Sequence, residues 1–138
     1  MRRRTLCRLL IAALAGWICA LLVLTVFGRP HTEPTLYLRP FFTTASMFEY
    51  ESWYVITYLL VGNIAWFVPI GFALPYLSRM RSWLAILCGA GLSVTIEALQ
   101  YLLAVGCTDI DDLIFNTLGT AIGVALFMLT KKKLPHLY

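Results

Sequence analysis

Residues Trp53–Leu77 read WYVITYLLVGNIAWFVPIGFALPYL, a run of 25 residues that contains no charged side chain. A helix needs about 20 predominantly apolar residues to cross the hydrocarbon core of a bilayer. Three further runs meet this requirement, at about 6–27, 83–105 and 113–130. The sequence therefore predicts an all-α integral membrane protein, in which four transmembrane helices form a single domain over residues 1–138.

The composition supports a membrane location. Of the 138 residues, 60% are hydrophobic and only 13% are charged, whereas a typical soluble domain has about 25% charged residues. The basic residues form short clusters between apolar runs and not the continuous basic face of a nucleic-acid binder, so we expect no nucleic-acid partner. The four cysteines show no metal-ligand spacing, and we expect no metal or other cofactor.

The distribution of Lys and Arg predicts the orientation, because cytoplasmic loops are enriched in these residues. With both termini in the cytoplasm, only Arg29 and Arg39 fall outside. The remaining nine basic residues then lie on the cytoplasmic side: Arg2, Arg3, Arg4, Arg8, Arg79, Arg81, Lys131, Lys132 and Lys133. This arrangement places the loops 28–52 and 106–112 outside, and the first of them shows few helical signals.

Polar and small residues inside the spans lie on two narrow stripes. One stripe holds Ser93, Glu97 and Gln100, and the other holds Asp112, Asn116, Gly119 and Gly123. At about 100° per residue, each set falls on one face of its helix. We predict that these faces meet in an outward-opening polar pocket between the second, third and fourth spans. The predicted pocket residues are Asn63, Ser93, Glu97, Gln100, Asp109, Asp111, Asp112 and Asn116.

Glu97 is the only charged residue deep in a span, and the sequence places no Lys or Arg at its depth. Desolvation disfavours the charged form of an isolated carboxylate. Three roles stay open for Glu97: a proton carrier, a ligand for a cationic or hydroxylated group, or a neutral hydrogen-bond partner of Asn63 or Asn116 between helices.

The acidic run before the fourth span also has two interpretations. Asp111 and Asp112 could cap the N-terminus of that helix and complement its dipole. Alternatively, Asp109, Asp111 and Asp112 could provide oxygen ligands for Mg²⁺ or Ca²⁺. Nothing in the sequence fixes a complete ligand set.

Small residues predict where helices approach closely. Gly119 and Gly123 are four residues apart in the fourth span, and Ala12, Gly16 and Ala20 form a similar stripe in the first span. Such spacing lets helix backbones pack tightly in a membrane. We therefore expect packing to be the role of both stripes, with the first span either peripheral or packed through its stripe.

Three blocks of the sequence resemble elements of the VanZ-like family. They read NIAWFVPIGF at 63–72, SVTIEALQ at 93–100 and TDIDDLIFNTLG at 108–119. The blocks occur in the order and at the separations that the family shows, so together they are specific. Two positions depart from the family pattern. Cys107-Thr108 stands where many members carry an Arg, and Tyr37 stands where the outer loop often has an Asn.

The resemblance implies a bacterial cytoplasmic membrane protein with a role in resistance to teicoplanin or other lipoglycopeptide antibiotics. It implies no established reaction. We expect a non-enzymatic protein whose pocket binds a glycopeptide antibiotic or a lipid-linked cell-wall precursor, with membrane lipid as a partner and with an oligomer possible.

Two other functions stay open. A small proton-coupled exporter would use Glu97 to exchange a proton for a cationic substrate, and four helices would require a dimer. A membrane enzyme acting on a lipid-linked phosphate would need a metal at Asp109, Asp111 and Asp112. The sequence offers no nucleophile-base pair and no arginine for phosphate binding beside these residues, which counts against an enzyme.

Overall fold

The computed structural model describes residues 3–133 and shows a mostly helical protein. Its four long helices are α1 (Arg3–Leu22), α3 (Trp53–Ser78), α4 (Ser82–Leu102) and α5 (Ile110–Lys133). A π-helical turn, η1 (Val23–Phe27), extends α1. Each long helix is sufficiently long and apolar to cross a membrane, so the prediction of four helices that could span it is confirmed. Arg2 and the side chain of Arg3, counted above in the charge distribution, lie outside the described residues.

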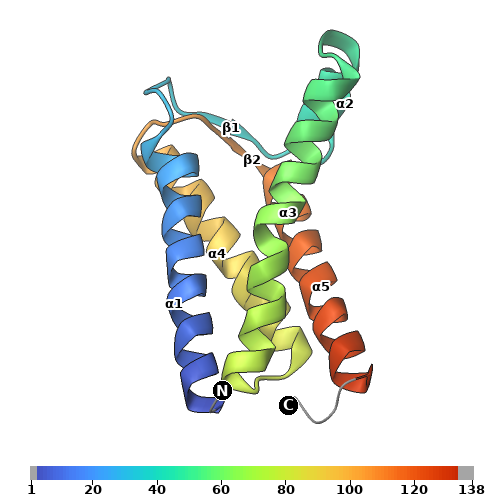
Figure 1. Cartoon of the computed structure of the whole chain (residues 1–138). Coiled ribbons are helices and arrows are strands. Elements are labelled where there is room, and N and C mark those ends of the chain that lie inside the picture. The colour runs from blue at the N-terminus through green and yellow to red at the C-terminus, as the bar shows by residue number, and fades with distance from the viewer. Residues whose placement is uncertain (1–2, 134–138) are drawn as a thin grey trace.

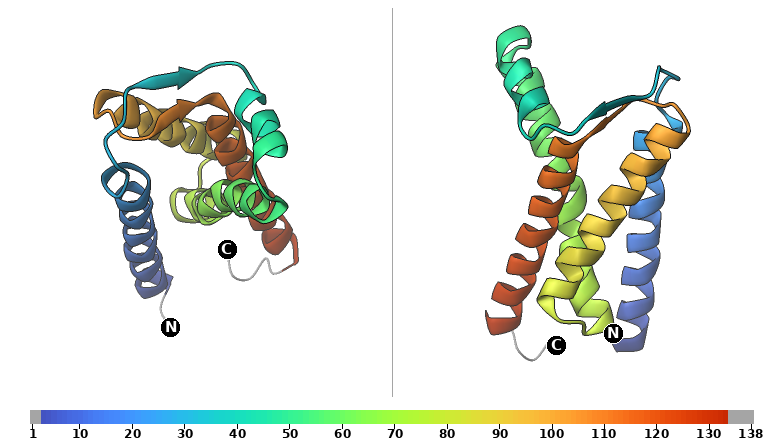
Figure 2. Two further views of the ribbon diagram at one scale, coloured as in Figure 1. Left: turned by 90° about the horizontal axis from the view of Figure 1, so that it is seen from above. Right: turned by 180° about the vertical axis from the view of Figure 1, so that it is seen from behind.

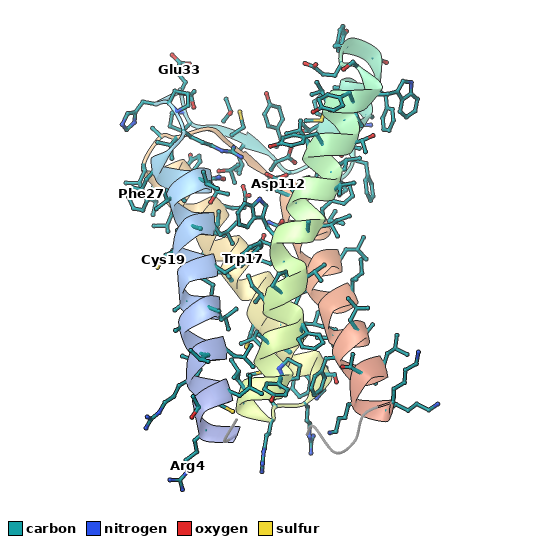
Figure 3. The ribbon with its side chains drawn as sticks, viewed as in Figure 1. Arg4, Trp17, Cys19, Phe27, Glu33 and Asp112 are labelled. Carbon is teal, nitrogen blue, oxygen red and sulfur yellow. The ribbon has the colours of Figure 1, made fainter. Side chains whose placement is uncertain are left out.

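The four helices form one bundle with two distinct ends (Figure 1). α1 begins and α5 ends at one end of the bundle, where the short turn between α3 and α4 also lies. The opposite end carries the connections from α1 to α3 and from α4 to α5. We call this end the outer end, after the side of the membrane that the sequence predicts for it. We call the end with the chain termini the basic end, because Arg4 lies there (Figure 3).

The expectation of a purely α-helical protein was incomplete, because the outer end carries a small sheet. Strand β1 (Thr35–Tyr37) pairs in parallel with β2 (Cys107–Asp109), with Leu36 opposite Thr108. The outer loop (residues 28–52), which provides β1, also contains helix α2 (Phe42–Tyr50), although the sequence of this loop showed few helical signals. Both elements depend on partners distant in sequence, which a local pattern does not reveal.

α3 and α5 form the closest helix pair. A Cβ atom at Gly119 would collide with the carbonyl oxygen of Ile64, and one at Gly123 would collide with that of Val68. The two backbones therefore touch, and the predicted packing role of these glycines is confirmed. This contact fixes the first turn of α5 against the outer half of α3, where the candidate site lies.

α1 packs at the edge of the bundle, but through a different face from the predicted one (Figure 2). Ala12, Gly16 and Ala20 are exposed, and a Cβ added at Gly16 would meet no atom within 4 Å. Large side chains on the opposite face, including the buried Leu21, pack instead against the core. Larger side chains fill the irregular space beside α3 and bury more surface than a stripe of small residues.

Candidate functional site

A cavity of about 560 Å³ opens at the outer end between α2, α3 and the start of α5. Its walls are mixed. The polar lining comes from Arg29, Thr43, Thr44, Ser46, Asn63, Asp109, Asp111 and Asp112, and the remaining lining from Tyr37, Phe42, Met47, Leu59, Leu60, Cys107 and Phe115. We call this space the outer cavity. Half of its wall belongs to the outer loop, which the sequence did not place there.

Asp111 holds the outer loop in position. Its carboxylate accepts hydrogen bonds from the backbone N–H of Phe41, from the backbone N–H of Thr44 at 3.0 Å and from the Thr44 hydroxyl at 2.7 Å. Phe41 is the N-cap residue of α2 and makes no side-chain capping bond, and Thr44 lies in the first turn of that helix. Asp111 therefore caps α2, across 67–70 residues of sequence, and not α5 as one interpretation proposed.

Asp109 and Glu97 join β2 to the transmembrane helices. The Asp109 carboxylate accepts a 2.9 Å hydrogen bond from the backbone N–H of Asp111, so Asp109 caps the start of α5. The Glu97 carboxylate accepts a 2.8 Å bond from the backbone N–H of Asp109. The Thr108 hydroxyl donates to the carbonyl of Glu97 at 3.1 Å. Glu97 is thus buried against the strand, and its partner is neither of the two asparagines considered above.

Those two asparagines bond elsewhere. The Asn63 amide donates to the Asp112 carboxylate and links α3 to α5 across the floor of the outer cavity. The Asn116 amide donates to the Ser93 hydroxyl at 2.9 Å and links α5 to α4. Figure 3 labels Asp112 near the start of α5, below the strands. The predicted stripes do face each other, although each side chain has a specific partner.

A second, much smaller cavity of about 20 Å³ lies deeper, next to Glu97, Gln100, Asp112 and Asn116. Gln100 donates to the carbonyl of Thr25 at 2.8 Å. Its side-chain oxygen is buried and has no hydrogen-bond partner within the described residues. The cavity is about the size of one water molecule. The single predicted pocket is therefore two spaces, because α4 lines only the smaller one.

Arg29 is the charged site residue that the sequence did not predict. It lines both cavities, and its guanidinium packs against Gly106, where a Cβ atom would lie 2.8 Å from one of its nitrogens. Glu97 and Asp112 line the smaller cavity together with Arg29. The expectation that no cation lies at the depth of Glu97 was therefore wrong. One feature of the sequence could have indicated Arg29: it is a basic residue on the side of the membrane where the positive-inside rule predicts few of them.

The route of the chain explains how Arg29 reaches this place. After η1, Gly28 donates a 2.6 Å hydrogen bond to the carbonyl of Val23 and the helix ends. His31 then forms a bridge with Val105, and Thr32 donates to the carbonyl of Ala104 at 2.8 Å. These bonds tie the loop after α1 to the loop after α4, directly above the polar residues.

The arrangement defines what the site can do chemically. It combines a cation, several carboxylates and hydroxyl groups beside an apolar wall, and it lies at the end of the bundle opposite the chain termini. Among residues 3–133, no three His, Cys, Asp or Glu side chains converge on a point where they could hold a metal ion. Asp111 in particular has both oxygens engaged by α2.

The comparison with known families bears directly on these residues. The sequence matches the profile of the VanZ/LLP1 family over residues 10–131. The chain belongs to the VanZ/LLP1 family. It is also 31% identical over 111 residues to Protein VanZ of Enterococcus faecium, an alignment that covers 80% of this chain and 62% of that protein. This chain therefore spans less than two thirds of the length of that relative. No solved structure matches it.

In this VanZ/LLP1 protein, each of the three blocks that indicated the family contributes residues to the site. The block 63–72 begins with Asn63 on the floor of the outer cavity. The block 93–100 carries Ser93, Glu97 and Gln100, which bond to α5, β2 and η1, respectively. The block 108–119 includes β2 and the first turn of α5. That these residues bind a ligand remains a prediction.

Proposed function

We propose that this chain resides in the bacterial cytoplasmic membrane, with both ends in the cytoplasm, and lowers sensitivity to teicoplanin and other lipoglycopeptides. It does so without catalysis, by binding an amphipathic ligand in the outer cavity. The ligand is the acyl or sugar portion of the antibiotic, or a lipid-linked cell-wall precursor. The family membership and the name of the Enterococcus relative support this proposal.

The two-sided lining of the outer cavity is the observation that carries the proposal. A volume of about 560 Å³ falls within the roughly 300–1,000 Å³ of ligand pockets in proteins. Leu59, Leu60, Met47 and Phe115 form a wall that suits an acyl chain or another apolar group. The polar floor beside them suits a hydroxylated or charged group, so a purely apolar lipid tail would leave that floor unpaired.

The floor retains bonding capacity for such a group. Asp112 uses one oxygen to accept from Asn63, and no second hydrogen bond to it is formed by residues 3–133. Arg29 offers N–H donors from the opposite side of the floor. A ligand with both donors and acceptors, such as a sugar or a peptide, matches this pair better than a simple cation or anion.

The test uses a substitution that fills the cavity without altering any charge. Leu60→Trp places a large ring in the cavity, whereas Val61→Trp places the same ring on the exposed side of the same helix. Both variants are expressed in a sensitive Gram-positive host, and susceptibility to teicoplanin and vancomycin is measured side by side. We expect Leu60→Trp to abolish the protection against teicoplanin and Val61→Trp to retain it, at equal membrane abundance. Full protection by Leu60→Trp would exclude the outer cavity as the binding site.

The proposed orientation has a separate test at Cys107, which is exposed and lines the outer cavity. A membrane-impermeant thiol reagent should label Cys107 in intact cells and should not label Cys7 or Cys88. Labelling of Cys107 only in inverted vesicles would reverse the orientation and place the cavity in the cytoplasm.

An enzyme acting on a lipid-linked phosphate is a second candidate, because Arg29 removes one objection to it. Its guanidinium lies in the same cavity as Asp109 and Asp112, and arginine is well suited to binding phosphate. Turnover of a lipid phosphate that requires a divalent metal would favour this candidate. Protection that persists in a metal-chelating medium would favour binding without catalysis.

A further inference from the structure

The basic end of the bundle contains a second large hollow, of about 490 Å³, unrelated to the outer cavity. It lies between the turn that joins α3 to α4 and the last turns of α5. Four cations line it: Arg79 and Arg81 from the turn, and Lys131 and Lys132 from α5. Phe127 and Met128 contribute an apolar side, and we call this hollow the basic groove.

Among residues 3–133, the charges of the groove have no Asp or Glu counterpart at that end of the bundle. All seven Asp and Glu residues belong to elements at the outer end: the segment between α1 and α3 (Glu33, Glu49, Glu51), the end of α4 (Glu97), β2 (Asp109) and the first turn of α5 (Asp111, Asp112). Arg79, Arg81, Lys131 and Lys132 are all exposed. Like charges that converge on one hollow repel each other unless an anion or solvent ions lie between them, so the groove is suited to binding an anion.

Helix dipoles explain only part of this cluster. Lys131 and Lys132 lie in the last turn of α5, where cations are favourable, and Arg79 similarly follows the end of α3. Arg81 is different, because it is the N-cap residue of α4 and makes no side-chain capping bond there. A cation beside a helix N-terminus is unfavourable, and the first N–H groups of that helix attract anions. Ser82, the first residue of α4, also lines the groove.

The apolar side of the groove indicates a lipid and not a soluble anion. Phe127 is buried beneath it, with the ammonium of Lys131 5.9 Å from the centre of its ring. Met128 is 55% exposed on the adjoining surface of α5. α4 has 21 residues, which span roughly 30 Å at 1.5 Å per residue, so its first residue lies at the edge of the hydrocarbon core. A headgroup phosphate occurs at this depth, directly above its acyl chains.

We propose that the basic groove binds the phosphate of an anionic phospholipid from the leaflet on the side of the chain termini. Arg81, Lys132 and the N-terminus of α4 hold the phosphate, and the exposed side of Met128 contacts the acyl chain. Basic pockets between transmembrane helices are established sites for anionic lipids in other proteins. This site is independent of the outer cavity and of the function proposed for it.

The test compares two charge-matched double variants of the full chain, purified in a mild detergent. Arg81→Gln with Lys132→Gln removes two cations from the groove. Arg4→Gln with Arg8→Gln removes two cations from α1, which does not line it. Binding of phosphatidylglycerol is measured by native mass spectrometry, with phosphatidylcholine as the neutral competitor. We expect the groove variant to bind phosphatidylglycerol about thirtyfold more weakly than the wild type, and the α1 variant to bind it unchanged.

Three results would overturn the proposal. Equal losses in both variants would show diffuse attraction by the whole basic end. Equal binding of the two lipids by the wild type would show that the groove does not recognise charge. Displacement of phosphatidylglycerol by millimolar inorganic phosphate would show a site for free phosphate. Circular dichroism of both variants verifies that they are folded, so that weaker binding is not caused by loss of the helices.

Discussion

The two ends of α5 both carry charge, but they use it differently. In the first turn, Asp111 and Asp112 accept hydrogen bonds from α2 and α3. In the last turn, Lys131, Lys132 and Lys133 are exposed, and the nearest specific partner is the ring of Phe127. The helix dipole favours both arrangements equally. The difference therefore comes from tertiary contacts and not from the helix itself.

This difference separates charges that build the structure from charges that remain available to a ligand. A buried carboxylate that accepts several N–H bonds cannot be removed without leaving those donors unpaired. An exposed lysine can be removed at little cost. Removing a bonded carboxylate at the outer end should therefore lower stability, whereas removing a cation at the basic end should weaken binding with little effect on stability.

The largest effect should come from separating α5 from α3 at Gly119. In Gly119→Ala the new methyl group meets the backbone carbonyl of Ile64, which cannot move like a side chain. Overpacking of this kind costs about 3 kcal/mol, and it disrupts the outer cavity as well. The matched control is Gly91→Ala in α4, where the added methyl group meets nothing within 4 Å. Thermal unfolding in detergent should show a lower Tm for the first variant only, and equal Tm values would refute the close contact.

The second effect concerns the anchor of the outer loop. Asp111→Ala removes the acceptor for three hydrogen bonds of α2, and we expect a loss of about 2 kcal/mol, since bonds to charged groups are worth about 1.5–3 kcal/mol. Hydrogen exchange should become faster across α2 while the transmembrane helices keep their protection. Glu49→Ala, an exposed carboxylate within α2 itself, serves as the control. Unchanged exchange in α2 would show that another contact holds it.

The sequence was sufficient for the transmembrane part of the fold and not for the outer layer. Long apolar runs specify membrane helices because lipid requires every backbone group to be bonded within the segment. α2 has no such constraint, and its cap comes from Asp111. β1 has three residues and exists through its pairing with β2. Neither element has a local pattern that would predict it.

For the candidate site, periodicity predicted which residues face inward but not which residues bond. Ser93, Glu97 and Gln100 are all buried, as their spacing required. The bonds of Glu97 depend on the position of β2, and Arg29 depends on the turn that ends η1. Both depend on the path of the loops between the helices, which a single sequence does not reveal. The cavity wall formed by α2 was missed for the same reason.

The third effect should appear in function and hardly in stability. Glu97→Gln retains an oxygen that can accept from the backbone N–H of Asp109 but removes the charge and the titratable proton. We expect a change in stability below about 1 kcal/mol and a loss of teicoplanin protection at normal membrane abundance. Glu97→Ala would not discriminate, because it also leaves that N–H unpaired. Full protection by Glu97→Gln would exclude its charge from the mechanism and leave Asp112 and Arg29 as the candidates.

The smallest effect on stability should occur at the basic end of α5. Replacing Lys131 and Lys132 by Gln removes two exposed cations whose favourable interaction with the helix dipole is worth at most a few tenths of a kcal/mol each in solvent. We expect the free energy of unfolding in lipid-free detergent to change by about 0.5 kcal/mol, roughly a quarter of the effect of Asp111→Ala. Added phosphatidylglycerol should then stabilise the wild type more than this variant, because the stabilisation by a ligand grows with the logarithm of its concentration relative to its Kd, and the variant has the higher Kd. A loss above about 1 kcal/mol without lipid would mean that these lysines also hold the fold together, and the contrast between the two ends of α5 would disappear.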